Sequence, residues 1–137
     1  MFGSGPSRKV LISFLVLIFL IHGWSLTSSA YFHLWWLDIL LHFLGGFWLG
    51  LLALYLLKDK NIFSQPYFSL LLVLALVALG GVLWEIGEYI LDELVLESVG
   101  MAQLQPGLED TISDLISDLI GGALASFIFQ KRGPAYN

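Results

Sequence analysis

Three aspartates recur at intervals of four residues near the carboxyl end of the chain, in a segment otherwise rich in Leu and Ile. The segment reads DTISDLISDLIGG, and the aspartates are Asp110, Asp114 and Asp118. In an α-helix, residues four apart lie on one face. Because unpaired charge is costly among hydrocarbon, carboxylates on such a face must bind cations, hold protons or line a wet cavity.

Two other apolar segments carry ionisable side chains at helical spacing. Asp38 and His42 are four residues apart, and Glu85, Glu88 and Asp92 follow an i, i+3, i+7 pattern. Such oxygen-rich sets suit hard divalent cations. The chain has no Cys, so any metal must be bound by carboxylate oxygen and imidazole nitrogen.

The composition is that of an integral membrane protein. Of the 137 residues, 58% are hydrophobic and 12% are charged, and the mean hydropathy is +0.84. A helix needs about 20 residues to cross a bilayer, and four apolar runs are long enough: residues 10–28, 31–57, 67–94 and 111–129. We expect an all-α, polytopic bundle of four transmembrane helices, forming a single membrane domain over residues 1–137.

The first run also resembles a secretory signal peptide. Arg8 and Lys9 precede it, and Ser28, Ser29 and Ala30 resemble a small-residue cleavage site. We favour a retained first helix, because cleavage would leave an odd remainder of three membrane helices.

The basic residues predict the orientation. All six fall on one side of a four-pass chain: Arg8, Lys9, Lys58, Lys60, Lys131 and Arg132. The positive-inside rule makes that side cytoplasmic and places both termini inside. Aromatic residues then mark the outer interface: Trp24, Tyr31, Trp35 and Trp36. We expect the cytoplasmic membrane of a bacterium or archaeon, with the lipid bilayer and no nucleic acid as partner.

The acidic residues are predicted to converge in the outer half of the bundle. We estimated their depth from the rise of about 1.5 Å per helical residue. This puts Asp38, Glu88 and Asp114 on one level, His42, Glu85 and Asp118 one level deeper, and Asp92 and Asp110 at the rim. No Lys or Arg lies in that half to balance the charge.

A short internal repeat relates two of the helices. Residues 38–46, from Asp38 to the pair Gly45-Gly46, align without a gap on residues 114–122, which end in Gly121-Gly122. The repeat predicts two hairpins, residues 1–60 and 61–137, related by a pseudo-twofold axis along the membrane normal. Small residues let membrane helices approach closely, so we expect these pairs and Gly80-Gly81 to draw the bundle together.

Three motifs resemble those of a known family. They are Asp38-x-x-x-His42 with its following glycines, Trp84-Glu85-x-x-Glu88-Tyr89, and Asp110-Thr111-x-x-Asp114. Together they resemble the YjdF-like family of small bacterial inner-membrane proteins over most of residues 34–125, with a fainter similarity to VanZ-like proteins. The first resemblance implies an inner-membrane protein, and the second an association with glycopeptide resistance at the cell envelope.

The leading hypothesis is a metal-dependent hydrolase or phosphotransferase that acts on a phosphate ester of a lipid or envelope precursor. The predicted metal ligands are Asp38, His42, Glu85, Glu88, Asp114 and Asp118, with Asp38 either binding the metal or orienting His42. Asp92 or Asp110 would be the catalytic base. Mg²⁺ or Mn²⁺ suits this set best, with Ca²⁺, Fe²⁺ and Zn²⁺ as alternatives. The Glu-x-x-Glu triplet speaks against a ferritin-like iron pair, which uses Glu-x-x-His.

Two other functions fit the same residues. A divalent-cation transporter or channel would need a homo-oligomer, because one chain offers no polar path below the glycine pairs. A non-catalytic assembly partner could instead sense metal or protons. We interpret His22 and His33 as interfacial anchors, residues 101–107 as a loop over the site, and Glu93, Glu97, Glu109 and Asp59 as water-facing.

Overall fold

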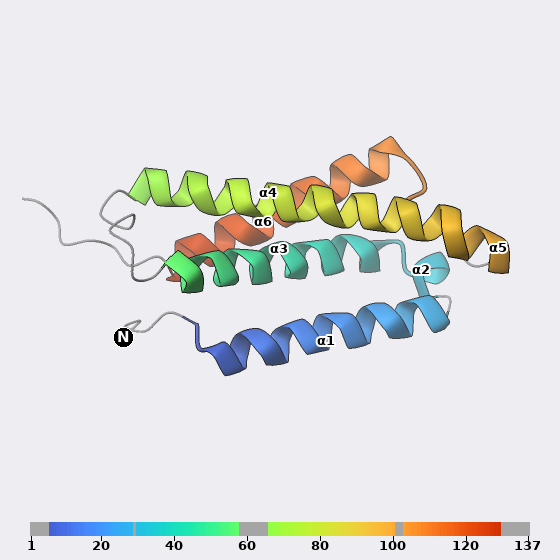
Figure 1. Cartoon of the computed structure of the whole chain (residues 1–137), viewed down its shortest axis with the longest axis horizontal. Coiled ribbons are helices and arrows are strands. Elements are labelled where there is room, and N and C mark those ends of the chain that lie inside the picture. Colours follow the sequence, from blue (N-terminus) through green and yellow to red (C-terminus); the bar gives the residue numbers. More distant parts are fainter. Residues whose placement is uncertain (1–5, 29, 58–65, 101–102, 130–137) are drawn as a thin grey trace, which may run out of the picture.

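The long apolar runs fold into long helices. The computed structural model describes residues 6–28, 30–57, 66–100 and 103–129 (Figure 1). Its elements are α1 (Arg8–Thr27), α2 (Ala30–His33), α3 (Trp36–Leu57), α4 (Pro66–Leu91), a π-helical segment (Asp92–Leu96), α5 (Glu97–Val99) and α6 (Leu108–Phe129). Four stretches are long and apolar enough to cross a bilayer: Arg8–Thr27, Trp36–Leu57, Tyr67–Val99 and Leu108–Phe129. The predicted all-α bundle with four transmembrane helices is confirmed.

Helix boundaries follow local chemistry. The side chain of Ser7 accepts a hydrogen bond from the Val10 amide at 3.3 Å and caps the start of α1. Pro66 opens α4, where its missing N–H is no loss. Gly100 ends α5 in the left-handed conformation, at φ 66°, which glycine adopts without strain.

The second apolar run is not one helix, as its sequence predicts, but the short α2 followed by α3. The break lets Tyr31 fold back toward α1, where its hydroxyl oxygen and Nδ1 of His22 are hydrogen-bonded at 2.7 Å. The third run extends further than predicted, to Val99, because a π-helical segment continues α4. The break after α2 and the π-helical segment before α5 lie at the same end of the bundle (Figure 1).

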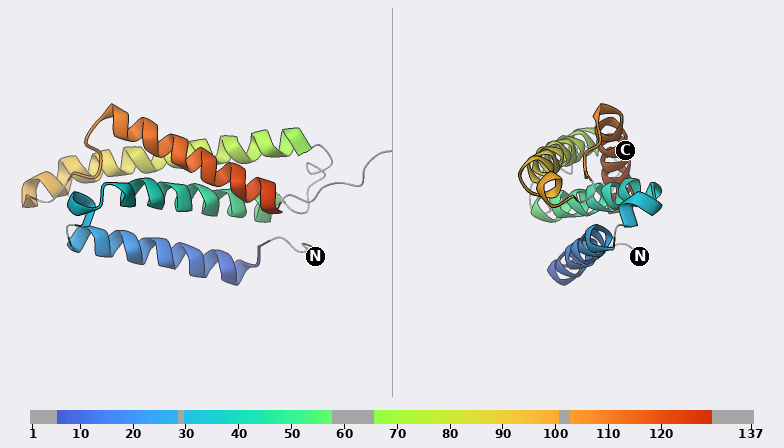
Figure 2. Two further views of the ribbon diagram at one scale, coloured as in Figure 1. Left: turned by 180° about the vertical axis from the view of Figure 1, so that it is seen from behind. Right: turned by 90° about the vertical axis from the view of Figure 1, so that its right-hand side faces the viewer.

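Helices α3, α4 and α6 form the core of the bundle, and α1 lies to one side of them (Figure 2). Helix α1 packs against α3. The ring centroids of Phe14 and Phe47 lie 6.1 Å apart in an edge-to-face arrangement, and Nε1 of Trp48 donates a hydrogen bond to the Leu11 carbonyl at 2.8 Å. The outer surface is strongly apolar, as at Leu20 (65% exposed) and Phe127 (78% exposed). Such a surface requires lipid around it.

Glycines let α3 and α6 come into backbone contact. A Cβ built at Gly46 would overlap the backbone of Asp118, and one at Gly121 would overlap the carbonyl of Phe43. A Cβ at Gly50 would lie 2.9 Å from that of Ala125. The predicted role of the glycine pairs is therefore confirmed at this crossing. Positions that are equivalent in the internal repeat, His42 and Asp118, also meet across it.

The acidic residues and the basic segments belong to opposite ends of the bundle. Helix α1 begins, α3 ends, α4 begins and α6 ends at one end (Figure 1). Arg8 and Lys9 open α1 at that end. The other basic residues follow α3 and α6 in sequence and lie outside the described residues: Lys58, Lys60, Lys131 and Arg132.

Candidate metal centre

Three helices bring seven ionisable side chains together near one end of the bundle. Helix α3 contributes Asp38 and His42, α4 contributes Glu85 and Glu88, and α6 contributes Asp110, Asp114 and Asp118. Within each helix the spacing of three or four residues puts these side chains on the face toward the other two helices. The structure thus brings all six predicted ligands into one cluster, hereafter the acidic cluster, together with Asp110.

His42 lies at the middle of the acidic cluster. Its Nε2 faces three carboxylate oxygens, from Glu85 at 3.7 Å, Glu88 at 3.9 Å and Asp114 at 4.0 Å. Its Nδ1 lies 3.4 Å from Oδ2 of Asp118, which accepts a hydrogen bond from it. One imidazole therefore contacts two helices, with each ring nitrogen directed at a separate set of acids.

The cluster offers three overlapping triads of ligand atoms, each with its atoms within 4.8 Å of one another. They are Asp38, His42 and Glu88; His42, Glu85 and Asp114; and Asp38, Asp110 and Asp114. Because Asp38 and Asp114 each belong to two triads, they could bridge neighbouring cations. Such an arrangement could hold one or two oxygen-bound divalent ions.

Several buried atoms of the cluster lack hydrogen-bond partners. They include Nε2 of His42, both oxygens of Glu85 and Asp114, and Oδ2 of Asp110. His42 is 5% exposed and Asp114 is 1% exposed. Buried polar groups in folded proteins are almost always satisfied. A cation at the triad of His42, Glu85 and Asp114 would give the imidazole nitrogen and one oxygen of each carboxylate a partner, so the residues present fit a bound divalent metal.

Glycines make room for Asp118. A Cβ at Gly45 would lie 3.9 Å from Oδ1 of Asp118, and a Cβ at Gly81 would overlap its Oδ2. The carboxylate thus sits among α3 and α4 backbone, where it can reach Nδ1 of His42. Carboxylates in that position fix the tautomer and orientation of metal-bound histidines. The structure therefore places Asp118, rather than Asp38, where a residue that orients His42 would lie.

Asp92 and Asp110, which the sequence predicts to lie together at the rim, are separated in the structure. Asp110 joins Asp38 and Asp114 at the mouth of the cluster. Asp92 instead accepts hydrogen bonds from the Leu104 amide, at 2.9 and 3.0 Å, and from the Gln105 amide at 2.8 Å. Its use as a base would require these bonds to break. The separation arises because the π-helical segment begins at Asp92 and the following loop folds back onto it.

The described part of that loop, residues 103–107, is anchored to both neighbouring helices. Besides the bonds to Asp92, the Gln105 side-chain amide donates to Oγ1 of Thr111 at 2.9 Å, and Leu104 is buried at 4% exposure. Residues 101–102 lie outside the described residues. The loop therefore ties the end of α4 to the start of α6 beside the cluster.

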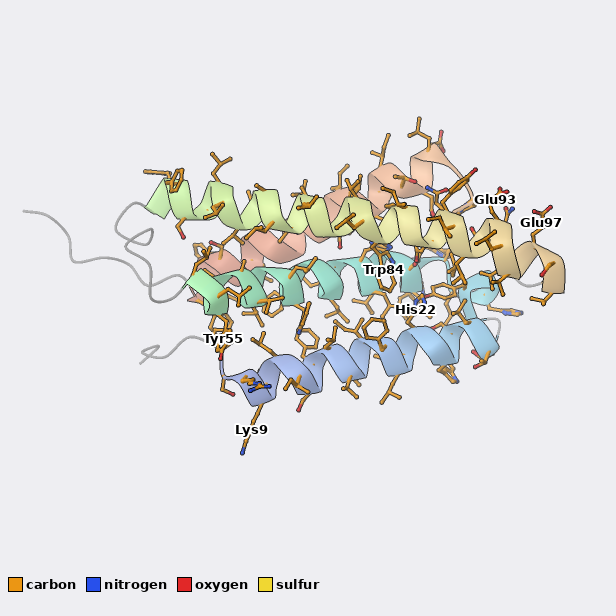
Figure 3. The ribbon with its side chains drawn as sticks, in the orientation of Figure 1. Lys9, His22, Tyr55, Trp84, Glu93 and Glu97 are labelled. Atoms are coloured by element: carbon orange, nitrogen blue, oxygen red, sulfur yellow. The ribbon has the colours of Figure 1, made fainter. Side chains whose placement is uncertain are left out.

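His22 belongs to the site, contrary to its interpretation as an interfacial anchor. A cavity of about 210 Å³ is lined by His22 of α1 together with Asp38, His42, Glu88 and Asp118. The His22 and Trp84 rings meet at 5.4 Å between α1 and α4 (Figure 3). Burial, and then the nearby Asp38 carboxylate, raise the pKa of Tyr31 well above its ordinary value, so the hydroxyl that is hydrogen-bonded to His22 keeps its proton.

A signal for His22 was present in the sequence. It lies seven residues after Leu15, on the α1 face that also carries Ile18, and this face packs inward. The water-facing prediction is confirmed for Glu93, Glu97 and Glu109, which are exposed; Glu93 and Glu97 point away from the bundle (Figure 3). Asp59 lies outside the described residues.

Comparison with known proteins finds one family. A family model described as a predicted membrane protein (DUF2238) matches residues 5–133. It is the YjdF-like family that the three motifs resemble, and no similarity to VanZ-like proteins is shown. No curated protein and no solved structure matches the chain.

Proposed function

The chain belongs to the DUF2238 family of predicted membrane proteins, and from that premise we propose that it is a membrane metalloprotein that hydrolyses or transfers a phosphate ester. The observation that carries the proposal is the environment of His42. Its unpartnered Nε2 faces three buried carboxylates from two other helices, while Nδ1 is held by a fourth. This donor set is an oxygen-rich site with one imidazole, which suits Mg²⁺ or Mn²⁺.

We assign two neighbouring cation positions that share a ligand. The deep position is formed by Nε2 of His42 with Glu85, Glu88 and Asp114. The mouth position is formed by Asp38 and Asp114, with Asp110 beside them as the candidate base. Asp118 orients His42 from Nδ1 and does not itself bind the ion.

The chemistry follows from the charges in the site. Bound divalent ions polarise phosphate oxygens and supply a nucleophile at neutral pH. All six Lys and Arg residues either open α1 or follow α3 or α6 in sequence, so none belongs to the helix segments that carry the acidic cluster. The cations alone would therefore neutralise the phosphate. Asp110 is placed to act as the base, since its Oδ2 is unpartnered, whereas both oxygens of Asp92 are engaged.

We propose that the site opens to the outer side of a bacterial or archaeal cytoplasmic membrane. Support comes from the six basic residues, which flank the opposite ends of the helices. Exposed Trp24, Trp35 and Trp36, at the end of α1 and the start of α3, have the position of an interfacial aromatic belt. The substrate would then be a phosphate ester of a lipid or of an envelope precursor.

Metal content and turnover test this function in the same preparation. Wild-type protein purified in detergent and supplied with Mn²⁺ should bind about one or two equivalents and release phosphate from lipid phosphates. Glu88→Gln removes a deep ligand and should lower both by more than roughly tenfold. Glu93→Gln, an exposed acid on the helical extension of α4, is the matched control and should behave as wild type. Full metal binding without phosphate release from a broad panel of lipid phosphates and pyrophosphates would reject catalysis and leave a metal-sensing role.

Transport is the second use of such a site, and the packing below it disfavours a route through one chain. Val73, Val77 and Ala125 are completely buried, and a Cβ at Gly122 would lie 2.7 Å from Cγ2 of Val77. Among the described residues this layer is tightly packed, and the polar side chains buried with it are the small Ser69 and Ser126. Metal-driven ⁵⁴Mn uptake into proteoliposomes would overturn the assignment as a hydrolase, and flux equal to that of empty vesicles would uphold it.

A further inference from the structure

The cavity that reaches the acidic cluster has a second, apolar part. It lies between α1, α3 and α4 and has a volume of about 210 Å³. Its walls away from the cluster are hydrocarbon and aromatic: Leu15, Phe19, Trp48, Leu49 and Trp84. One space therefore joins the candidate cation ligands to a surface suited to an apolar chain.

The edge of this cavity between α1 and α4 is formed by aromatic side chains. The centroid of the Trp84 ring on α4 lies 5.4 Å from that of His22 on α1 (Figure 3). It also lies 6.0 Å from the ring centroid of Phe19 on α1. Phe19 is 50% exposed and Trp84 is 37% exposed, so both rings also lie at the outer surface. In a membrane that surface faces acyl chains, so a lipid chain that entered between α1 and α4 would pass these two rings.

Apolar space also lies beside α1 nearer the other end of the bundle. A second cavity, of about 430 Å³, shares Leu15 and Trp48 with the first and extends to Tyr55 and Arg8. Arg8, Leu15 and His22 recur every seven residues on one α1 face. At about 1.5 Å per residue, this face covers about 21 Å from Arg8 to His22. That distance is most of the hydrocarbon thickness of a bilayer, which is about 30 Å.

We propose that the cavity between α1, α3 and α4 binds the hydrocarbon chain of a membrane lipid phosphate, whose anionic head group would be held through cations at Asp38, His42 and Glu88. This inference rests on the proposed function and names its substrate class. A lipid chain fits because the walls are apolar, the edge between α1 and α4 faces the bilayer, and the polar end of the cavity is the acidic cluster. A water-soluble phosphate would gain nothing from these walls.

Photo-crosslinking in the presence of Mn²⁺ tests the chain site without requiring turnover. The probe is phosphatidic acid with a diazirine in one acyl chain, present at low fraction in phosphatidylcholine nanodiscs that contain the full chain. Mass spectrometry of the labelled peptides should place adducts on the cavity walls, at Leu15, Leu49 and Trp84. Leu15→Trp fills the cavity and should reduce these adducts at least about fivefold. Leu17→Trp, on the exposed face of α1, is the matched control and should leave them unchanged.

A second variant guards against misfolding of Leu15→Trp. Phe19→Ala removes one of the two rings at the edge between α1 and α4 and should increase the initial rate of cavity labelling about twofold or more, while Leu20→Ala, at a 65% exposed neighbour, should not. Labelling spread evenly over the outer faces of the helices, and insensitive to both cavity variants, would overturn the proposal. Protection of the cavity walls by a second copy of the chain, seen as crosslinked dimers in place of lipid adducts, would overturn it as well.

The failures of the two proposals are distinguishable. If the chain site exists but the protein is not a hydrolase, cavity labelling will follow the pattern above while no lipid phosphate is cleaved. If the protein is a hydrolase without a chain site, Leu15→Trp will cleave long-chain phosphatidic acid and a soluble aryl phosphate at the wild-type rates. If both hold, Leu15→Trp will lose turnover of the long-chain lipid at least about tenfold and keep turnover of the aryl phosphate.

Discussion

At the scale of single residues, the site depends on how one imidazole is held. His42 meets Asp118 at Nδ1 and presents Nε2 to the acids of α4 and α6. A neutral histidine can bind a cation only through its unprotonated nitrogen, and a carboxylate at the other nitrogen fixes which one that is. Metal affinity and stoichiometry can therefore distinguish His42, as a ligand, from Asp118, as the residue that orients it.

We expect Asp118→Asn to weaken metal binding without abolishing it. The asparagine oxygen can still accept from Nδ1 of His42, but the negative charge that strengthens the imidazole as a ligand is lost. Affinity for Mn²⁺, measured by calorimetry, should fall about 10- to 100-fold with the number of ions unchanged. Glu109→Gln, an exposed acid on the same helix, should retain wild-type affinity. Loss of an ion from the stoichiometry would instead make Asp118 a direct ligand.

Tyr31 is expected to make the free energy of unfolding depend on pH in the alkaline range. Its pKa is raised by burial and then by Asp38, so the folded protein holds the phenolic proton more tightly than the unfolded chain does. This contribution to the free energy of unfolding is complete below about pH 10 and is lost as pH rises above it, by up to about 1.4 kcal/mol per pH unit. In thermal unfolding between pH 9 and 11.5, Tyr31→Phe should show a shallower decline than wild type. Tyr67→Phe, at an 88% exposed tyrosine, is the control; equal slopes for wild type and Tyr31→Phe would contradict the argument.

At the scale of helices, the α3–α6 crossing sets the position of every ligand on those two helices. Gly46→Ala or Gly121→Ala would insert a Cβ into the backbone of the facing helix, so the helices must separate. We expect a loss of about 1–3 kcal/mol in stability together with reduced Mn²⁺ affinity, measured by unfolding in detergent and by calorimetry. Gly87→Ala has open space around its Cβ and should be neutral or slightly stabilising. Equal melting temperatures for all three variants would show that the crossing can relax.

We expect Asp92 to stabilise the loop that follows α5 and not to serve as the base in phosphate release. Asp92→Ala leaves the Leu104 and Gln105 amides without their acceptor, at a cost of about 1–3 kcal/mol. Hydrogen exchange at these two amides should accelerate strongly, whereas Glu93→Ala should not change it. Asp92→Asn keeps an acceptor oxygen and should retain most of the phosphate release. If Asp92→Asn instead abolishes phosphate release while the loop stays protected, Asp92 is the base.

Residue spacing in the sequence predicted which side chains share a face of one helix. It did not predict how two helices are rotated against each other. The faces of α3, α4 and α6 follow from intervals of three and four residues, so the convergence of Asp38, His42 and Glu88 could be foreseen. The rotation of one helix against another could not, and it decides that Asp118 rather than Asp38 meets Nδ1 of His42. The π-helical segment, which begins at Asp92, has no simple sequence signal and removes that residue from the rim.

At the scale of the whole molecule, charge is divided between the two ends. The acidic cluster lies near one end, and the basic residues open α1 or follow α3 and α6 in sequence at the other. Such a division orients the chain in a membrane, because basic residues stay on the cytoplasmic side. In the proposed orientation the mouth of the site, at Asp110, would face the outer solution, from which both divalent cations and the head groups of outer-leaflet lipids could reach it.

The absence of cysteine allows this orientation to be measured directly. We expect Gln103→Cys, in the loop beside the site, to react with a membrane-impermeant maleimide in intact bacterial cells, since Gln103 is exposed. Asn61→Cys, between α3 and α4 in sequence, should react only after the membrane is permeabilised. The parent chain has no thiol, so any labelling belongs to the introduced residue. The reverse pattern would place the acidic cluster on the cytoplasmic side, where the candidate substrates would be lipid phosphates of the inner leaflet and the positive-inside argument would fail for this protein.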